Sequence, residues 1–204
     1  MPAAPLELAT REPIKPRERA DAARNRAKVL ASALELFAQH GVAAVTMDEI
    51  AAQAGVGKGT LYRRFGDKAG LAVALLDERE RDLQARILRG RGPLGPDGDY
   101  SPTQRLAAFV RAYVDYVRST LELVFLSQTA SPGARHRTGA NAFWGAHCRV
   151  LLAAAGAAEA ELRAEVLLAA LSAEQIRYWT HDSKLPAKRI TTALVHVAEA
   201  LAKG

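Results

Sequence analysis

The chain has 204 residues, of which 49% are hydrophobic and 25% charged, and its formal net charge of +6 permits a polyanionic partner without proving one. This balance excludes an intrinsically disordered protein, and the single cysteine, Cys148, excludes an intrachain disulfide and favours a reducing, cytoplasmic compartment. The longest apolar stretch, residues 150–158, is far shorter than the roughly 20 residues that a membrane span needs. We therefore expect a soluble, cytoplasmic protein with no membrane partner.

Residues 1–20 are expected to form a flexible basic arm. The segment contains four prolines and no helical periodicity, and its positive charge comes from Arg11, Lys15, Arg17 and Arg19. Two interpretations remain open for it: a solvated tail, or an arm that touches DNA phosphates or a minor groove.

A helical pattern starts at Arg24, with apolar residues at i, i+3, i+4 and i+7, and Gly41 ends it. A second helix begins after Thr46, because Thr46 and Glu49 have the S/T-x-x-E spacing of a capping box. The predicted apolar stripe of the first helix consists of Ala27, Leu30, Ala31, Leu34, Phe37 and Ala38.

A glycine-containing turn and a third short helix complete a helix-turn-helix over residues 46–65. Gly55 permits the sharp reversal, Val56 can fill the space between the helices, and the helix over residues 58–64 buries Leu61. Such a helix has free faces for recognition. A surface rich in hydrogen-bond donors suits DNA phosphates and base edges. The alternative interpretation of these basic residues is an ordinary solvated face. The donors on and beside this helix are Lys58, Thr60, Tyr62, Arg63, Arg64 and Lys68.

Six further helices are predicted for the rest of the chain. The first of them has a charged middle, residues 77–82, which we expect to be a solvated face, and the helix itself can act as a rigid lever. No segment shows the period-two alternation of a strand, so the predicted fold class is all-α, with about nine helices. The six segments span residues 67–88, 101–117, 121–127, 138–155, 159–181 and 187–203.

The string KVLASALELFAQHGVAAVTMDEIAAQAGVGKGTLYRRFGDKAGL, residues 28–71, resembles the TetR (tetracycline-repressor) family of bacterial one-component regulators. The resemblance covers about the first third of the chain. It implies a three-helix, helix-turn-helix DNA-binding domain over residues 21–70 and a helical ligand-binding and dimerisation domain over residues 71–204.

The resemblance also implies roles for individual residues. Thr46, Tyr62 and Lys68 correspond to phosphate-contacting positions, and Arg64 lies where family members vary a DNA-facing residue. Gly57 departs from the family pattern, because many members carry a serine there that caps the recognition helix, and this puts a phosphate contact at that position in doubt. The full predicted DNA-binding set is Thr46, Lys58, Gly59, Thr60, Tyr62, Arg63, Arg64 and Lys68.

A small-molecule effector is expected in the C-terminal domain, although the sequence does not identify it. The candidate lining residues are aromatic side chains with polar tips, and the alternative is that they belong to the hydrophobic core. Gln128, Asp115 and Glu174 could add polar contacts. The predicted ligand-binding residues are Phe109, Tyr113, Tyr116, Phe143, Trp144, His147 and Tyr178.

The last two predicted helices carry apolar stripes, and the resemblance implies that they form an intersubunit four-helix bundle in a homodimer. Periodicity alone fits an intrachain core equally well. A two-fold dimer would place two recognition helices in successive major grooves, about 34 Å apart. The stripes consist of Leu162, Val166, Ala169, Ala170, Ala173 and Ile176, and of Ile190, Leu194, Val197 and Leu201.

No enzymatic pattern is recognisable. The histidines lack H-x-x-x-H spacing, one cysteine cannot anchor a thiolate metal site, and residues 55–60 lack the order of a phosphate loop. Neither a cofactor nor a metal is expected. The predicted function is a ligand-responsive repressor that binds a near-palindromic double-stranded DNA operator. The alternatives are a DNA-binding protein without small-molecule control and, less supported, a metal-sensing regulator or a helical enzyme.

Overall fold

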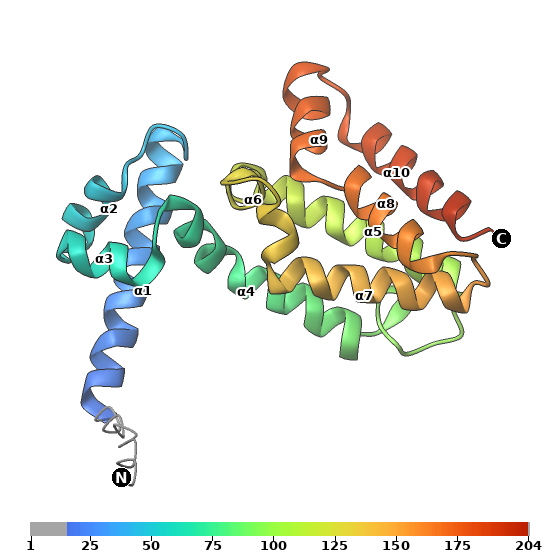
Figure 1. Ribbon diagram of the computed structural model, residues 1–204, viewed down its shortest axis with the longest axis horizontal. Coiled ribbons are helices and arrows are strands. Elements are labelled where there is room, and N and C mark those ends of the chain that lie inside the picture. The colour runs from blue at the N-terminus through green and yellow to red at the C-terminus, as the bar shows by residue number, and fades with distance from the viewer. Residues whose placement is uncertain (1–15, 204) are drawn as a thin grey trace, which may run out of the picture. The chain divides into compact units, whose positions relative to one another are not determined.

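The computed structural model describes residues 16–203, and every regular element among them is helical (Figure 1), which confirms the predicted all-α fold class. Most of the predicted basic arm lies outside the described residues; its last five residues form the start of the first helix. The ten α-helices of the described part are α1 (Pro16–His40), α2 (Met47–Ala54), α3 (Lys58–Phe65), α4 (Lys68–Arg89), α5 (Pro102–Ser119), α6 (Leu121–Thr129), α7 (Gly139–Ala154), α8 (Ala160–Ala170), α9 (Ala173–Arg177) and α10 (Ala187–Leu201).

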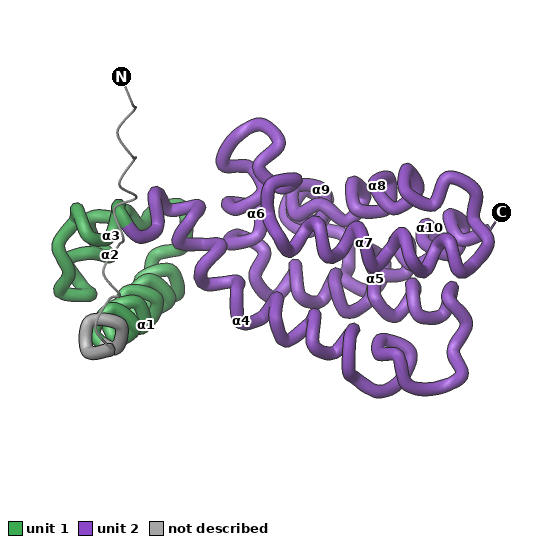
Figure 2. Tube along the Cα trace, turned by 60° about the horizontal axis from the view of Figure 1, so that its bottom comes forward, with its two compact units in different colours: residues 1–63 green, residues 64–204 purple. Residues whose placement is uncertain are grey.

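Three shorter helical elements lie between these helices. They are the 3-10 turns η1 (Gly92–Leu94) and η2 (Ala134–Arg137) and the π-helical turn η3 (Tyr178–Asp182). The chain divides into two compact units, residues 1–63 and residues 64–204 (Figure 2). No helix of the described part is long and apolar enough to cross a bilayer.

The first unit is built on the packing of α1 against α2. The predicted stripe of α1 is wrong by a rotation of the helix: Leu34 is 51% exposed, whereas Val29, Ala33 and Leu36 are buried. Both sets have helical spacing in this alanine-rich segment, so periodicity could not choose between them. Packing against α2 selects the buried face, and Phe37 is common to both stripes.

The second unit is organised around α5, which packs against α7, α10 and α4. The Ser101 hydroxyl caps α5 by accepting a hydrogen bond from the Gln104 backbone N–H at 3.2 Å, and the Gln104 Oε1 accepts one from the Ser101 N–H at 2.9 Å. The whole predicted stripe of this helix is buried: Leu106, Phe109, Val110, Tyr113, Val114 and Val117.

The helix predicted over residues 159–181 is broken, and this is why the described part has ten α-helices rather than about nine. The chain leaves α8 at Leu171, and Ser172 caps a new helix, α9, by accepting a hydrogen bond from the Gln175 N–H at 3.3 Å. The signal was present in the sequence, since Ser172 and Gln175 have capping-box spacing. The break separates the predicted stripe into an exposed part on α8 and a buried part at Ala173 and Ile176.

Candidate nucleic-acid interface and an enclosed polar cavity

Thr46 sets the start of α2 through a complete capping box. Its Oγ1 accepts a hydrogen bond from the Glu49 backbone N–H at 3.2 Å, and the Glu49 carboxylate accepts from the Thr46 N–H at 2.7 Å and from the Thr46 hydroxyl at 2.8 Å. The Thr46 side chain is exposed. The cap therefore holds a hydroxyl at the surface, beside the N-terminus of a helix, where an anion is favoured.

Gly55 and Val56 form the turn as the sequence predicts. Gly55 has a φ of 65°, the left-handed conformation that glycine adopts without a steric penalty. The Val56 N–H donates to the Ala51 carbonyl at 3.0 Å, so backbone N–H groups of the turn satisfy carbonyl acceptors at the end of α2. The reversal that starts α3 is therefore fixed by the backbone.

Helix α3 has one buried residue, Leu61, which is 1% exposed. The remaining predicted donors of the helix are on its surface, and Tyr62 is 46% exposed. Gly57 accepts backbone hydrogen bonds from Thr60 and Leu61 at its carbonyl, at 2.9 and 3.1 Å, and so occupies the cap position. An eight-residue helix with one buried anchor leaves its other faces available to a partner.

An ion pair ties the first residue of α3 to α2. The Lys58 Nζ lies 2.5 Å from the Asp48 carboxylate, and both side chains are substantially exposed. This hydrogen bond, together with the charge of Asp48, raises the pKa of the Lys58 ammonium. Sequence reasoning missed the role of Asp48. This residue precedes Lys58 by ten positions and lies on α2, on the other side of the turn. Asp48 orients the lysine that the family resemblance assigns to recognition.

The two remaining predicted DNA contacts, Arg64 and Lys68, are placed at the end of α3 and the start of α4. Asp67 caps α4 by accepting a hydrogen bond from the Gly70 N–H at 2.8 Å. Both cations belong to the second compact unit, residues 64–204. Their assignment to DNA continues to rest on the motif.

The second unit contains an enclosed cavity of about 20 Å³, room for about one water molecule. Three of the predicted ligand-binding residues line it: Tyr113, Tyr116 and Trp144. The Tyr113 ring lies 5.9 Å from that of Tyr116 and 5.8 Å from that of Trp144, measured between centroids. Polar groups reach the same cavity from α6 and from the start of α7, namely Ser127, Gln128, Thr138 and Asn141.

The other predicted ligand-binding residues lie elsewhere. Phe109 is fully buried and does not line the cavity, although its ring lies 5.6 Å from that of Tyr113, and Phe143 packs edge-on against Trp144. The His147 ring lies 5.2 Å from that of Phe109 and does not line the cavity. Tyr178 is 55% exposed on η3, away from these rings.

Glu80 is the cavity residue that sequence reasoning missed. Its carboxylate accepts a hydrogen bond from the Tyr116 hydroxyl at 2.8 Å, and partial burial raises the pKa of the Glu80 carboxyl while that hydrogen bond lowers it. The charged run over residues 77–82 was expected to be solvated. Glu80 nevertheless lies four residues after Leu76 and three before Leu83, and both leucines are buried. Residues at this spacing share one face of a helix, so the periodicity could have identified Glu80 as partly buried.

Burial shifts several other ionisable groups around this core. It raises the pKa of the Tyr113 hydroxyl to about 12 and that of the Cys148 thiol to about 12. It lowers the pKa of His147 to about 4, with a smaller contribution from the charge of Arg105. His147 is therefore neutral at physiological pH, and its Nε2 is buried without a hydrogen-bond partner.

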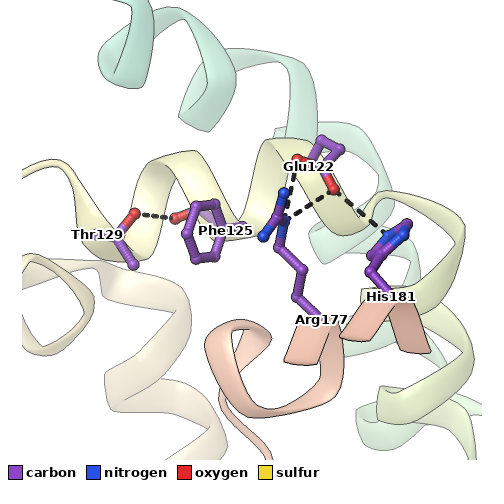
Figure 3. Close-up of polar contacts among 5 residues, drawn as sticks. All are labelled: Glu122, Phe125, Thr129, Arg177 and His181. Carbon is purple, nitrogen blue, oxygen red and sulfur yellow. Dashed lines mark hydrogen bonds and ion pairs between the residues drawn. The ribbon is translucent and has the colours of Figure 1, made fainter. Parts of the chain in front are cut away.

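Helix α6 carries two of the polar cavity residues. Ion pairs and a cation–π contact join it to α9 and η3 (Figure 3). The Arg177 Nε lies 3.1 Å from the Glu122 carboxylate, its guanidinium sits 4.8 Å over the Phe125 ring, and His181 is 3.6 Å from the same carboxylate. Gln128 adds a second tie, because its Oε1 accepts a hydrogen bond from the Ala173 N–H at 2.9 Å. Within residues 16–203 no group of side chains is arranged to hold a metal ion.

Sequence comparison identifies the N-terminal part of the chain. Residues 29–75 match the sequence profile described as "Bacterial regulatory proteins, tetR family". An HTH-type transcriptional regulator of Staphylococcus aureus (strain bovine RF122 / ET3-1) is 41% identical over 69 residues, and one of strain USA300 is 42% identical over the same length. The match spans 34% of this chain and about a third, 36%, of each relative.

Structural comparison covers nearly the whole chain. A TetR-family transcriptional regulator from Streptomyces coelicolor superposes with a TM-score of 0.60 at 22% identity, covering 89% of this chain and 95% of that one. A TetR-family structure from Syntrophomonas wolfei gives 0.65 at 18% identity, covering 90% and 97%. At these identities the likeness shows the fold. All of these proteins are described as transcriptional regulators. The segment of residues 29–75 therefore matches the TetR family profile, and the fold of the chain is shared with solved TetR-family regulators.

Proposed function

We propose that this regulator is a ligand-responsive repressor that binds a near-palindromic double-stranded DNA operator as a homodimer. The observation that carries the DNA part is the surface of α3: one buried anchor, Leu61, and hydroxyl, ammonium and guanidinium donors on the exposed faces. Such donors position a protein on phosphates and read base edges in the major groove. The exposed Thr46 hydroxyl, at the N-terminus of α2, supports a phosphate contact beside it.

The dimer part is supported by apolar side chains left at the surface of the second unit. Leu162 and Val166 on α8 are 55% and 49% exposed, and Val197 on α10 is 38% exposed. Helices α8 and α10 pack against each other, and they lie side by side in Figure 1. By contrast Ile190 and Leu194 of α10 are buried within the chain. An exposed stripe on two neighbouring helices fits a self-complementary two-fold interface better than an intrachain core.

Ligand control is supported by the polar and aromatic cavity, which belongs to the second unit. Ligand binding regulates DNA affinity only if the ligand prefers the state that binds DNA poorly. The small volume of the cavity, about 20 Å³, favours a second candidate: a DNA-binding regulator controlled by a protein partner or by its own abundance. A compound that changes DNA affinity decides between the two.

Four substitutions test the DNA interface, read by fluorescence anisotropy on DNA selected from a random library and on a scrambled copy. Tyr62→Phe and Lys68→Ala should weaken binding to both DNAs alike, and Lys68→Ala should lower the salt slope by about one. Lys58→Ala and Arg64→Ala should change sequence preference, by about 1–3 kcal/mol at a contacted base pair. Arg118→Ala is the charge-matched control, on exposed α5 surface, and should leave the salt slope unchanged. Equal losses on both DNAs for all four variants would refute the assignment.

The dimer is tested by its mass in solution. Val166→Glu places a charge in the exposed stripe of α8 and should convert a dimer to a monomer in sedimentation equilibrium. Leu88→Glu introduces the same charge at a 55% exposed position of α4 and should leave the mass unchanged. A dimer that persists with Val166→Glu would place the interface elsewhere.

A further inference from the structure

The enclosed cavity has an unbalanced charge. Glu80 is the one charged side chain among the described residues that line it. Its carboxylate has a hydrogen-bond donor in the Tyr116 hydroxyl, and no arginine, lysine or histidine of the described part forms an ion pair with it. The nearby charge of Asp77 is also negative. A partly buried carboxylate held by a neutral hydroxyl alone is incompletely compensated, and a cation would complete its environment.

The rest of the lining suits the same ligand class. Three aromatic rings, those of Tyr113, Tyr116 and Trp144, line one space. The Tyr116 and Trp144 ring centroids each lie within 6 Å of the Tyr113 ring centroid. The faces of such rings attract ammonium groups, most strongly where water is excluded. Arg135 acts on Tyr113 from η2 but does not line the cavity. An anionic ligand would therefore meet Glu80 without a compensating cation.

An open groove between α4 and α5 borders the cavity. A groove of about 690 Å³ runs along these two helices, and Glu78, Asp82 and Asp115 supply its acidic groups, with Arg79 and Arg86 beside them. Tyr116 lines both this open groove and the enclosed cavity. The Tyr116 side chain, whose hydroxyl donates to Glu80, is therefore shared by the two spaces.

We propose that the cavity is the binding site of an organic cation, an ammonium group on an apolar body, which enters from the α4–α5 groove and displaces the Tyr116 hydroxyl from Glu80. This names the effector class of the regulator proposed above and rests on that proposed function. Movement of the Tyr116 ring opens the cavity to the cation. The ammonium then contacts the Glu80 carboxylate and the remaining rings, and the apolar body occupies the space that the Tyr116 ring leaves.

A matched trio of probes tests the charge requirement by isothermal titration calorimetry on the full chain at pH 8. Benzyltrimethylammonium, its neutral carbon isostere neopentylbenzene and the anion benzenesulfonate share a phenyl ring and differ in charge. The cation should bind at least tenfold more tightly than the neutral isostere, and the anion should not bind. Equal affinity of the cation and the isostere, or no binding of the cation, would overturn the proposal.

Two substitutions test the residues. Glu80→Gln keeps an acceptor for Tyr116 and removes the charge, so it should abolish the preference for the cation. Asp97→Asn removes the same charge from an exposed residue outside both the cavity and the groove, and should change the affinity less than twofold. Tyr116→Phe removes the competing hydroxyl and should tighten cation binding severalfold, a gain that loss of folding cannot produce. Unchanged cation binding in Glu80→Gln, or a loss in Tyr116→Phe, would overturn the proposal.

The location and the regulatory role are read separately. The chain has two tryptophans, so in a Trp179→Phe variant the tryptophan fluorescence comes from Trp144 alone. Binding of the cation should change this fluorescence, and unchanged fluorescence would overturn the location. DNA titrations with and without the cation then distinguish the two proposals. Failure of cation binding with intact DNA binding refutes the cation site only. Cation binding that leaves the DNA affinity unchanged supports the site and refutes ligand control through it.

Discussion

Helices α3 and α5 show how differently the two units use their side chains. Of the eight residues in α3 one is buried, whereas eight of the 18 residues in α5 are buried, three of them aromatic. The polar contacts differ in the same way: the Lys58–Asp48 pair is exposed, and the Tyr116–Glu80 hydrogen bond is partly buried. Helix α3 holds its donors at the surface, whereas α5 has its Tyr116 hydroxyl partly buried against Glu80.

This contrast has a consequence for recognition and for stability. Exposed cations act on a polyanion through interactions that salt screens, so the contacts of α3 and of Lys68 beside it should weaken steeply as salt rises. Enclosed polar groups are less screened and depend on desolvation and fit. The first unit should also depend on its caps and turn, and the second on its buried aromatic core.

The largest expected effect is in the aromatic core of the second unit. Phe109→Ala removes a fully buried ring in contact with Tyr113, Trp144 and His147, and should lower the free energy of unfolding by about 3–5 kcal/mol. Tyr178→Ala, at a 55% exposed ring, is the control and should cost less than about 1 kcal/mol. Urea unfolding followed by tryptophan emission measures both. Similar costs for the two variants would break the contrast between core and surface.

His147 should make the stability of the second unit depend on pH. The pKa of His147 is lowered from 6.5 to about 4, so between these values the unfolded chain binds a proton that the folded chain does not. The free energy of unfolding should therefore fall as the pH falls through this window, by about 3 kcal/mol in all, and be fully retained above it. Urea unfolding at pH 7 and pH 4 should show this loss in the wild type and not in His147→Gln.

His136→Gln, at an exposed histidine of the same unit, is the control and should lose stability with pH as the wild type does. If His147→Gln shows the same pH dependence as the wild type, the neutral buried histidine is not responsible for it.

A smaller effect is expected at the turn of the helix-turn-helix. Gly55→Ala places a side chain at a φ of 65°, where its Cβ meets no neighbour within 4 Å, so the cost is that of the backbone conformation alone, about 1–2 kcal/mol. Hydrogen exchange of the α2 amides should accelerate by the corresponding factor. Gly59→Ala, in the first turn of α3 with open space around its Cβ and no positive φ, should instead be neutral or slightly stabilising. Unchanged exchange in Gly55→Ala would show that the left-handed turn is not under this constraint.

The smallest effect is a gain at the cap of α3. Gly57→Ser adds a hydroxyl at the cap position, where the added Cβ would meet no atom closer than 4.0 Å, and should stabilise α3 by a few tenths of a kcal/mol. Slower exchange of the α3 amides would measure it, with Gly57→Ala as the variant that adds bulk without a cap. A loss of stability in the serine variant would contradict the cap geometry.

The helix-turn-helix was predictable because its signals are local. The capping box at Thr46, the left-handed glycine at Gly55 and the single buried Leu61 each follow from residues within one or two turns, and each is confirmed. The stripe of α1 was not, because two alanine-rich faces have the same spacing and only contact with α2 selects one. The ion pair between Asp48 and Lys58 was missed because it joins two helices across the turn.

The second unit was predictable as helices but not as a cavity. The α5 stripe and its cap follow from the sequence, whereas the grouping of Tyr113, Tyr116 and Trp144 depends on how α5 and α7 pack. Glu80 was taken for part of a solvated run because its neighbours in sequence are charged. Its position relative to Leu76 and Leu83, rather than to its adjacent residues, decides its burial. The break at Ser172 was concealed by an apolar pattern that continues across it.

The central claim is that α3 is a sequence-reading DNA helix, and the most direct test is a titration of the full chain by fluorescence anisotropy. The DNAs are a sequence enriched from a random library and a scrambled copy of equal composition, each measured over a salt series. We expect the enriched DNA to bind about 10³-fold or more tightly at physiological salt, with both affinities falling linearly in the logarithm of salt concentration. Failure to enrich any sequence, or equal affinity for both DNAs, would contradict the claim.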